Sequence, residues 1–436
     1  MPKRIVIHAG PGKTGTSAIQ AVLNDQREAL AVRGVLYPKH DMDSNRVSSG
    51  NRGALLDRTD DGNWTVSKDK VNTLRARFEA SGCHTLLLSS EFFFRRIPGI
   101  HEHFPEAEFI AYLRHPIELE ESGYNQRVKR HDRTSRFHLP DDFDYRTLRY
   151  VSRLLDASPA PDVVLRPYAK PLFTGGTILA DLFAILGLDA PAEDQVVNPS
   201  YTFEALQFKR HANHFPLGRL GPELDRLLQR CDIGQRPYSL LTPQRYAELN
   251  GRVVDQLTEF LERHALDGLA TFRDHVAATP PRPYHGQDIG ADALDEIARW
   301  VKREAPQLHG LLAELAGKFP NLSLPNPHYY RCLGVAPSED GPAPDRETIA
   351  ALVARLRDDA HGAEADFCRE LALYLEDRGD LEAASHFMAA AHAFRPNGEI
   401  IRGKLNDYRI RSGGERTSRS FRFRSLLIRL RGMLSR

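Results

Sequence analysis

The stretch His8-Ala9-Gly10-Pro11-Gly12-Lys13-Thr14-Gly15-Thr16-Ser17 lies between a short apolar run, Arg4–Ala9, and a helical pattern, Ser17–Arg33. Its glycines suit a tight turn, and the start of a helix offers unpaired backbone N–H groups and the positive end of the helix dipole. Lys13 and three hydroxyl groups bring a charge and further donors to the same place. The stretch therefore predicts a strand, an anion-binding loop and a helix. The alternative interpretation is a glycine-rich turn with an exposed lysine.

The loop lacks the spacing of the nucleotide-binding motif GxxxxGK[ST]. With the glycine–lysine pair at Gly12-Lys13, that motif would need a glycine where Ile7 stands. We also find no paired acidic motif of the kind that holds magnesium beside a nucleotide. A P-loop nucleotide kinase-like enzyme is therefore the enzymatic alternative and not the first interpretation.

Around the loop, apolar β-rich runs alternate with helical patterns through the first two hundred residues. Such alternation predicts an α/β fold with a central parallel sheet flanked by helices. Ligands of such sheets bind beyond the carboxyl ends of the strands. The predicted strands are Arg4–Ala9, Thr85–Ser89, Glu108–Leu113 and Val163–Arg166, and the predicted helices are Ser17–Arg33, Lys68–Ser81, Ile117–Lys129 and Ile178–Leu186.

A second candidate phosphate contact follows the third of these strands. Arg114-His115-Pro116 stands at its end, and Ser122 comes eight residues after the arginine. Arginine offers planar, bidentate donors to a phosphate, and a serine in the following helix adds a hydroxyl. Alone, the pattern also fits an ordinary helix start after proline. Together with the upstream loop it predicts that the chain holds two phosphates of one ligand.

A candidate general base stands between these two motifs. Leu86-Leu87-Leu88 runs into Ser89-Ser90-Glu91-Phe92-Phe93, so a buried strand ends in two serines and a glutamate beside aromatic side chains. An apolar setting raises the pKa of a carboxyl group toward the range that suits a base. The alternative is a glutamate at a helix N-terminus, stabilised by the dipole and capped by Ser89 or Ser90. The two interpretations are compatible.

The order strand, G-x-x-K-T-G-T-S and helix, followed by Glu91 and by the Arg114/Ser122 pair, resembles the sulfotransferases that use 3′-phosphoadenosine 5′-phosphosulfate (PAPS), most closely the bacterial type. The resemblance covers Lys3–Tyr201 and implies a P-loop NTPase-like sulfotransferase fold. A C-terminal Arg-Lys-Gly segment, which cytosolic members use at the 3′-phosphate, has no clear counterpart. The resemblance implies that Gly12, Lys13, Thr14, Gly15, Thr16 and Ser17 hold the 5′-phosphosulfate, that Arg114 and Ser122 hold the 3′-phosphate, that Tyr168 lies near the adenine, and that Lys13 and Glu91 are catalytic.

The implied reaction moves a sulfuryl group from PAPS to a hydroxyl of an acceptor such as a glycan, a lipid or a small metabolite. It needs no metal, so none is expected, and no nucleic acid is expected as a partner. His101-Glu102-His103 has a metal-like composition but no third ligand at a useful spacing, so we assign it to the surface. The non-enzymatic alternative is an inactive adaptor that acts through the helical C-terminus.

The chain is too long for one ordinary core, which predicts one large domain with smaller additions. We assign residues 1–320 to the sulfotransferase-like domain, with the catalytic motifs in 3–201 and a helical, substrate-side region in 202–320. A stretch rich in proline and acidic residues places a linker at 321–345. Residues 346–411 form a helical segment and residues 412–436 a tail.

The helical segment resembles a single tetratricopeptide repeat. Leu371, Ala372, Gly379, Ala384, Ala391 and Pro396 have the spacing of that repeat. Because about three repeats are usually needed for stability, the alternative is a plain helical hairpin. Either form offers a surface to a protein partner.

The tail is strongly basic, with eight arginines and one glutamate in residues 411–436. As a helix it would place Phe423, Leu426, Leu427, Leu430 and Leu434 on one stripe beside arginines, which suits an anionic inner membrane surface. The alternative is a disordered, solvated tail. Four scattered cysteines without CxxC pairs, and the lack of a signal-peptide core, predict a cytoplasmic protein that is peripheral to the membrane at most.

Overall fold

The computed structural model describes residues 3–42, 48–59, 63–190, 200–320, 324–336, 363–377, 381–395 and 398–411. The chain divides into two compact units. The first contains 1–126, 137–202 and 235–287, and the second contains 127–136, 203–234 and 288–436.

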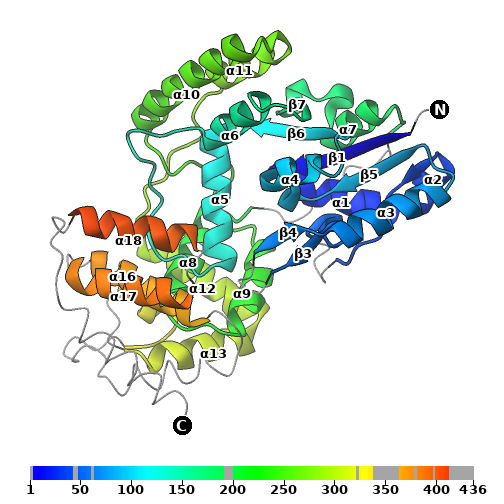
Figure 1. Ribbon diagram of the computed structural model, residues 1–436. Helices are drawn as coiled ribbons and strands as arrows, with labels where there is room; N and C mark the ends of the chain where they lie inside the picture. Colours follow the sequence, from blue (N-terminus) through cyan, green and yellow to red (C-terminus); the bar gives the residue numbers. More distant parts are fainter. Residues whose placement is uncertain are drawn as a thin grey trace. The chain divides into compact units, whose positions relative to one another are not determined.

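The first unit is built on the predicted parallel sheet, which has five strands (Figure 1). Its strands are β1 (Arg4–Gly10), β2 (Val35–Leu36), β5 (Thr85–Ser89), β6 (Glu108–Arg114) and β7 (Asp162–Tyr168), in the order β2-β5-β1-β6-β7. All neighbouring pairs are parallel. Continuous apolar runs such as Ile5–Ile7 and Leu86–Leu88 are fully or almost fully buried, as expected of strands that helices cover on both faces.

Two helices bury one face of the sheet. Ile19, Val22 and Leu23 of α1 (Thr16–Asp25) and Leu182 and Phe183 of α7 (Ile178–Leu186) form one core cluster with residues of β1, β5 and β6. The flanking helices α3 (Lys68–Ala80) and α5 (Pro116–Arg130) match predicted helices, whereas α4 (Ile97–His101) and α6 (Arg146–Leu155) were not predicted. The predicted central parallel sheet flanked by helices is thus confirmed.

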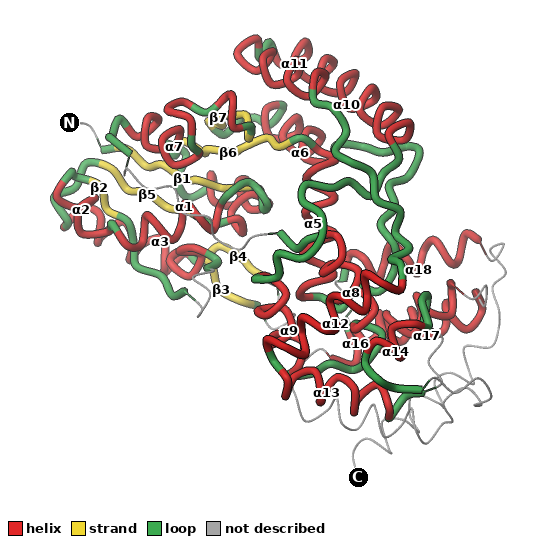
Figure 2. The backbone as a smooth tube through the Cα atoms, turned by 180° about the vertical axis from the view of Figure 1, so that it is seen from behind, coloured by secondary structure: helices red, strands yellow, loops and turns green. Residues whose placement is uncertain are grey.

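Three local features differ from the predictions. The predicted helix Ser17–Arg33 is two helices, α1 and α2 (Arg27–Val32), because Gln26 leaves helical geometry at φ −92° and ψ 12°. Strand β2 was not expected. A two-stranded antiparallel hairpin, β3 (Leu56–Arg58) with β4 (Trp64–Val66), was not expected either, and Figure 2 shows it separate from the main sheet.

Short 3-10 helices and two further α-helices complete the first unit. The 3-10 helices η1 (Gly50–Ala54) and η2 (Glu91–Arg96) flank the end of β5, whereas η3 (Lys170–Leu172), η4 (Thr174–Gly176) and η5 (Asp267–Leu269) are connectors. The helices α10 (Pro243–His264) and α11 (Ala270–Ala278) lie in residues 202–320, which we predicted to form one helical, substrate-side region. Residues 203–234 and 288–320 of that region belong to the second unit.

The second unit is helical. It contains α8 (Phe203–Ala212), α9 (Leu220–Gln229), α12 (Ala291–Glu304), α13 (Pro306–Gly317) and α14 (His328–Cys332). Helix α14 lies within the range assigned to the linker, and its Tyr329 and Tyr330 are buried. Residues 337–345 of that range lie outside the described residues.

The tetratricopeptide-like segment forms the helices α16 (Ala363–Asp377), α17 (Leu381–Phe394) and α18 (Glu399–Arg411). Ala372, Ala384 and Ala391 are fully buried in one core with residues of all three helices, so the small side chains lie where helices cross closely. Gly379 and Pro396 lie outside the described residues, as does the tail 412–436, so the membrane and protein-partner interpretations stay predictions. No helix within the described ranges has the length and apolarity needed to cross a bilayer.

A buried acidic residue ties the carboxyl-terminal halves of β6 and β7 to α7. Asp181 is 1% exposed and accepts hydrogen bonds from Tyr112 (2.9 Å), from the Thr174 backbone (2.9 Å) and from the Arg166 guanidinium. Burial alone would raise the pKa of Asp181, but these hydrogen bonds, that of Arg166 foremost, outweigh it and lower the pKa. The ionised carboxylate therefore stabilises the fold.

We expect Asp181→Ala to lower the free energy of unfolding by about 3 kcal/mol, because it leaves a cation and two donors without their acceptor. This stability is fully present above the ordinary pKa of 3.8 and is lost as the pH falls through the lowered folded value. Urea unfolding of the wild type and of Asp181→Ala at neutral pH and below pH 3.8 checks this. The difference between their free energies of unfolding should be smaller at the lower pH. The control is Asp189→Ala, a fully exposed partner of Arg33, for which we expect little change in stability. Equal effects of the two variants would contradict the prediction.

Candidate functional site

The loop between β1 and α1 is compact and held by its own hydroxyl groups. Thr14 Oγ1 donates to the carbonyl oxygen of Pro11 at 2.5 Å, and Thr16 Oγ1 lies 3.5 Å from the same oxygen. Both threonines are buried, whereas Gly12, Lys13 and Ser17 are half-buried. The two threonine hydroxyls therefore shape the loop, and its outward donors are backbone N–H groups, Lys13 and Ser17.

Two glycines allow close approach to other parts of the site. Gly15 has φ +73°, and a Cβ there would lie 3.0 Å from Ile178 and 3.2 Å from Tyr168. A Cβ on Gly12 would lie 3.3 Å from Oε2 of Glu91. Gly15 precedes α1, and within the described residues neither a side-chain cap nor an acidic first-turn residue occupies the helix start. The N-terminus of α1 therefore keeps its capacity for an anion.

Glu91 lies two residues after the end of β5, against the loop. A Cβ on Gly10 would be 3.2 Å from Cα of Glu91, and the Ser90 backbone N–H donates to the His8 carbonyl at 3.1 Å. The Ser90 hydroxyl accepts from the Phe92 N–H at 3.2 Å and caps η2, which confirms the capping interpretation.

The Glu91 carboxylate is accessible but partly desolvated. The residue is exposed at the rim, yet the protein around it displaces much of its water, and this desolvation raises its pKa. Lys13 and Arg52 oppose that rise through their positive charges. A reachable carboxyl group with a raised pKa is suited to accept a proton from a ligand.

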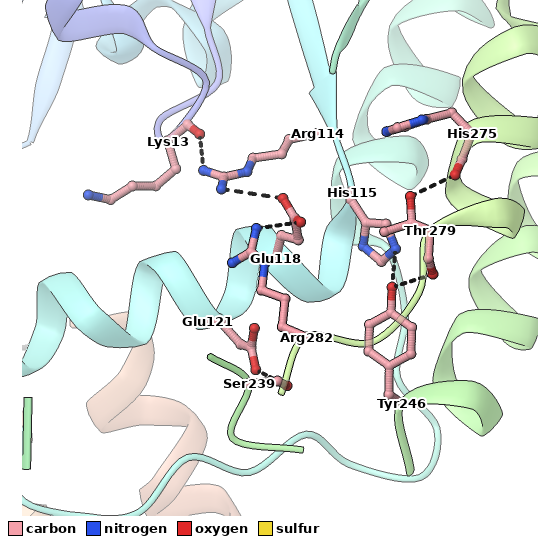
Figure 3. Close-up of polar contacts among 10 residues, drawn as sticks. All are labelled: Lys13, Arg114, His115, Glu118, Glu121, Ser239, Tyr246, His275, Thr279 and Arg282. Atoms are coloured by element: carbon pink, nitrogen blue, oxygen red, sulfur yellow. Dashed lines mark hydrogen bonds and ion pairs between the residues drawn. The ribbon is translucent and has the colours of Figure 1, made fainter. Parts of the chain in front are cut away.

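Arg114, at the end of β6, is joined directly to the loop. Its Nη1 donates to the Lys13 carbonyl at 2.8 Å, and its Nη2 lies 3.5 Å from Oε2 of Glu118 (Figure 3). Its guanidinium stands 5.3 Å from the ring centroid of Tyr168 at the end of β7. Arg114 Nε is buried and has no hydrogen-bond partner among the described residues. Figure 3 shows the Lys13 amine extending away from Arg114.

The structure thus brings together the loop, Glu91, Arg114 and Tyr168 at the carboxyl ends of β1, β5, β6 and β7. Ser122 lies further along α5 and is half-buried, and in the described part of the chain no hydrogen bond joins it to Arg114 or to the loop. His8 is buried beneath the loop, bonds Ser89 Oγ at 2.8 Å, and has its pKa lowered to about 4 by burial.

The residues that support Arg114 were not predicted from the sequence. Glu118 also pairs with Arg282 at 2.5 Å, so one carboxylate lies between two guanidinium groups (Figure 3). The four-residue spacing of Arg114 and Glu118 is a helical-pair signal that could have revealed their contact. Arg282 lies in a proline-rich segment far along the chain and gave no such signal.

One further interpretation is corrected. His101, which we assigned to the surface, is buried at the end of α4, because that helix turns its apolar side and this imidazole inward. Glu102 is exposed and His103 is half-buried. Within the described ranges no group of three or more histidine, cysteine or acidic residues is placed to hold a metal.

Comparison with known proteins gives no relative: no family model, no curated protein and no solved structure matches the chain.

Proposed function

We propose that the protein is a sulfotransferase that moves a sulfuryl group from PAPS to a hydroxyl group of an acceptor. The observation that carries the proposal is the meeting of the loop, Glu91 and Arg114 at the ends of adjacent parallel strands β1, β5 and β6. In open parallel sheets, ligands bind at such carboxyl ends. A P-loop NTPase-like sulfotransferase fold is the finer architecture that we propose for the first unit.

The residues present fit a ligand with two anionic ends. The start of α1, Lys13 and Ser17 suit the 5′-phosphosulfate, because a helix N-terminus and an ammonium group favour an anion. Arg114 suits the 3′-phosphate, because its Nε has no partner within the described residues and its guanidinium can contact a phosphate through two N–H groups. Ser122 adds a hydroxyl from α5, the helix that follows Arg114, and Tyr168 offers a ring to the adenine base.

The chemistry of the donor is that of a sulfuryl group activated by a phosphate leaving group. Glu91 accepts the acceptor's hydroxyl proton while the oxygen–sulfur bond forms and the bond between sulfur and the phosphate oxygen breaks. Lys13 stabilises the negative charge left on that oxygen. The products are a sulfate ester and 3′-phosphoadenosine 5′-phosphate (PAP), with the proton on Glu91. Positioning and charge stabilisation then account for catalysis.

Ligand-induced stabilisation separates this proposal from its kinase-like alternative. A ligand that binds only the folded state raises the melting temperature. We expect PAP to raise the Tm of the full chain and magnesium-ATP to leave it nearly unchanged. A larger shift with magnesium-ATP than with PAP would favour the kinase, and no shift with either would favour the inactive adaptor.

We expect Lys13→Met to reduce transfer from radiolabelled PAPS by about a hundredfold, which is typical of removing one group that stabilises transition-state charge. Transfer would be followed with a panel of hydroxyl acceptors. The matched control is Lys39→Met, a change at an exposed lysine outside the loop, which should keep wild-type rates. Wild-type turnover of Lys13→Met would refute the assigned role.

A further inference from the structure

Arg52 packs against two aromatic rings, which contact each other edge-to-face, next to the candidate base. Its guanidinium carbon lies 4.3 Å from the ring centroid of Trp64 and 4.4 Å from that of Phe92, the residue that follows Glu91. Contact with aromatic rings holds a guanidinium in place without a carboxylate or carbonyl acceptor for its N–H groups. The donors of Arg52 therefore stay available for a ligand.

The segment that carries Arg52 is fixed against the end of β5. The Ser89 N–H donates to Asn51 Oδ1 at 2.8 Å, and the Ser90 hydroxyl donates to the Ser49 carbonyl at 2.6 Å. Gly50 has φ +64°, and a Cβ there would lie 1.8 Å from the Ser89 carbonyl oxygen, so only glycine permits this approach. Helix η1 is thereby fixed to the end of β5, two residues before Glu91.

Arg96 fixes the two aromatic residues in turn. Its Nε donates to the Trp64 carbonyl at 2.8 Å, and its Nη1 donates to the Phe92 carbonyl at 3.0 Å. This arginine joins the hairpin strand β4 to η2 through two of its donors. Arg52 is therefore a pre-organised cation, and Arg96 is part of its support.

The charges around Arg52 favour an incoming anion. Within the described residues, no carboxylate lies at ion-pair distance from its guanidinium. Burial lowers the pKa of Arg52, the neighbouring Arg58 lowers it further, and Glu91 raises it. A half-buried cation that is repelled by a nearby second cation is stabilised when an anionic group binds beside both of them.

We infer that Arg52 recognises a carboxylate on the acceptor, so that the acceptors are hydroxyl compounds that carry a carboxylate, such as acidic sugars. The inference rests on the proposed function, because Glu91 must act on a hydroxyl of the same molecule. A planar carboxylate fits the fork of a guanidinium through two parallel hydrogen bonds. Binding by Arg52 would hold the acceptor beside Glu91.

Trp64 reports directly on this site. The chain has two tryptophans, and Trp300→Phe leaves Trp64 as the only one. With PAP present, glucuronate should produce a saturable change in the fluorescence of this variant, and glucose should not. Adding Arg52→Gln should weaken the glucuronate response about tenfold or more, the loss expected for charge-assisted hydrogen bonds. Arg95→Gln is the matched control, because Arg95 is an exposed arginine of η2 stacked on Tyr150.

The inference is overturned if glucuronate gives no saturable response, or if Arg52→Gln responds like the control. Transfer to a phenyl glucuronide and to the matching phenyl glucoside gives a second readout. We expect Arg52→Gln to raise KM for the glucuronide alone, whereas a residue that only positioned Glu91 would lower kcat for both. A PAP titration of each variant is independent of these readouts: failure of the wild type to bind PAP would refute the proposed function and not the carboxylate site.

Discussion

Glu91→Gln should reduce kcat for sulfuryl transfer by about a hundredfold to ten-thousandfold, the range by which a positioned general base accelerates a reaction. Glutamine keeps the shape of the side chain but cannot accept the proton. Because desolvation raises the pKa of Glu91, the wild-type rate should rise with pH along a limb whose midpoint lies above the ordinary value of 4.5. Single-turnover measurements with radiolabelled PAPS across the acidic range would give both results.

The control for this experiment is Glu102→Gln, which removes the charge of an exposed glutamate shortly after η2. We expect the control to keep both the rate and the acid limb. PAP should bind to Glu91→Gln as it does to the wild type, because the proposed role of the carboxylate is toward the acceptor. A Glu91→Gln variant with normal turnover, or with the same acid limb, would show that another group takes the proton.

The same substitution should stabilise the fold. A carboxyl group whose pKa is raised in the folded state binds its proton more tightly there than in the unfolded chain. Stability is therefore greatest below the unfolded pKa of 4.5 and falls as the pH rises through the folded value. At neutral pH the ionised carboxylate is a destabilising group that glutamine removes. We expect a higher Tm for Glu91→Gln at neutral pH and little difference below pH 4.5, as is common where an active site trades stability for function.

The fold was largely predictable because its sheet is buried on both faces. Runs such as Leu86–Leu88 are apolar throughout, and helical patterns separate them, so strand and helix assignments agree with the structure. Strand β2 was missed because Val35–Leu36 is too short for any periodicity. The hairpin strand Leu56–Arg58 has one apolar residue beside two charged ones, and its pairing with Trp64–Val66 is a tertiary effect. Nothing local marks the break at Gln26, since glutamine is an ordinary helix former.

The site was predictable where its parts follow strands directly. The loop and Glu91 come just after strands and Arg114 ends one, and parallel strands end at the same edge of the sheet. Arg282 and Arg52 were not predictable. Arg282 reaches Glu118 across 164 positions of sequence, and the place of Arg52 depends on two aromatic residues from different elements. Such contacts are set by tertiary packing and leave no spacing signal.

Arg114→Ala should remove the ability of the protein to distinguish PAP from 5′-AMP. If Arg114 binds the 3′-phosphate through two charge-assisted hydrogen bonds, its loss weakens PAP binding by about a hundredfold or more. Binding of 5′-AMP, which lacks that phosphate, should change little. The four affinities form a thermodynamic cycle, and isothermal titration calorimetry of both ligands with both proteins gives the coupling between the guanidinium and the 3′-phosphate.

The cycle also distinguishes direct contact between Arg114 and the 3′-phosphate from an indirect role in which Arg114 supports the loop. Arg114 donates to the Lys13 carbonyl, so its removal could loosen the loop and weaken both nucleotides by the same factor. That outcome would give zero coupling, and Arg114 would then be a positioning residue for the loop. Arg114→Lys sharpens the distinction, because lysine keeps the charge and loses the planar fork; it should recover part of the PAP affinity. Arg77→Ala, at an exposed position of α3, should leave all affinities unchanged. A large coupling that lysine partly restores would identify direct contact with the 3′-phosphate.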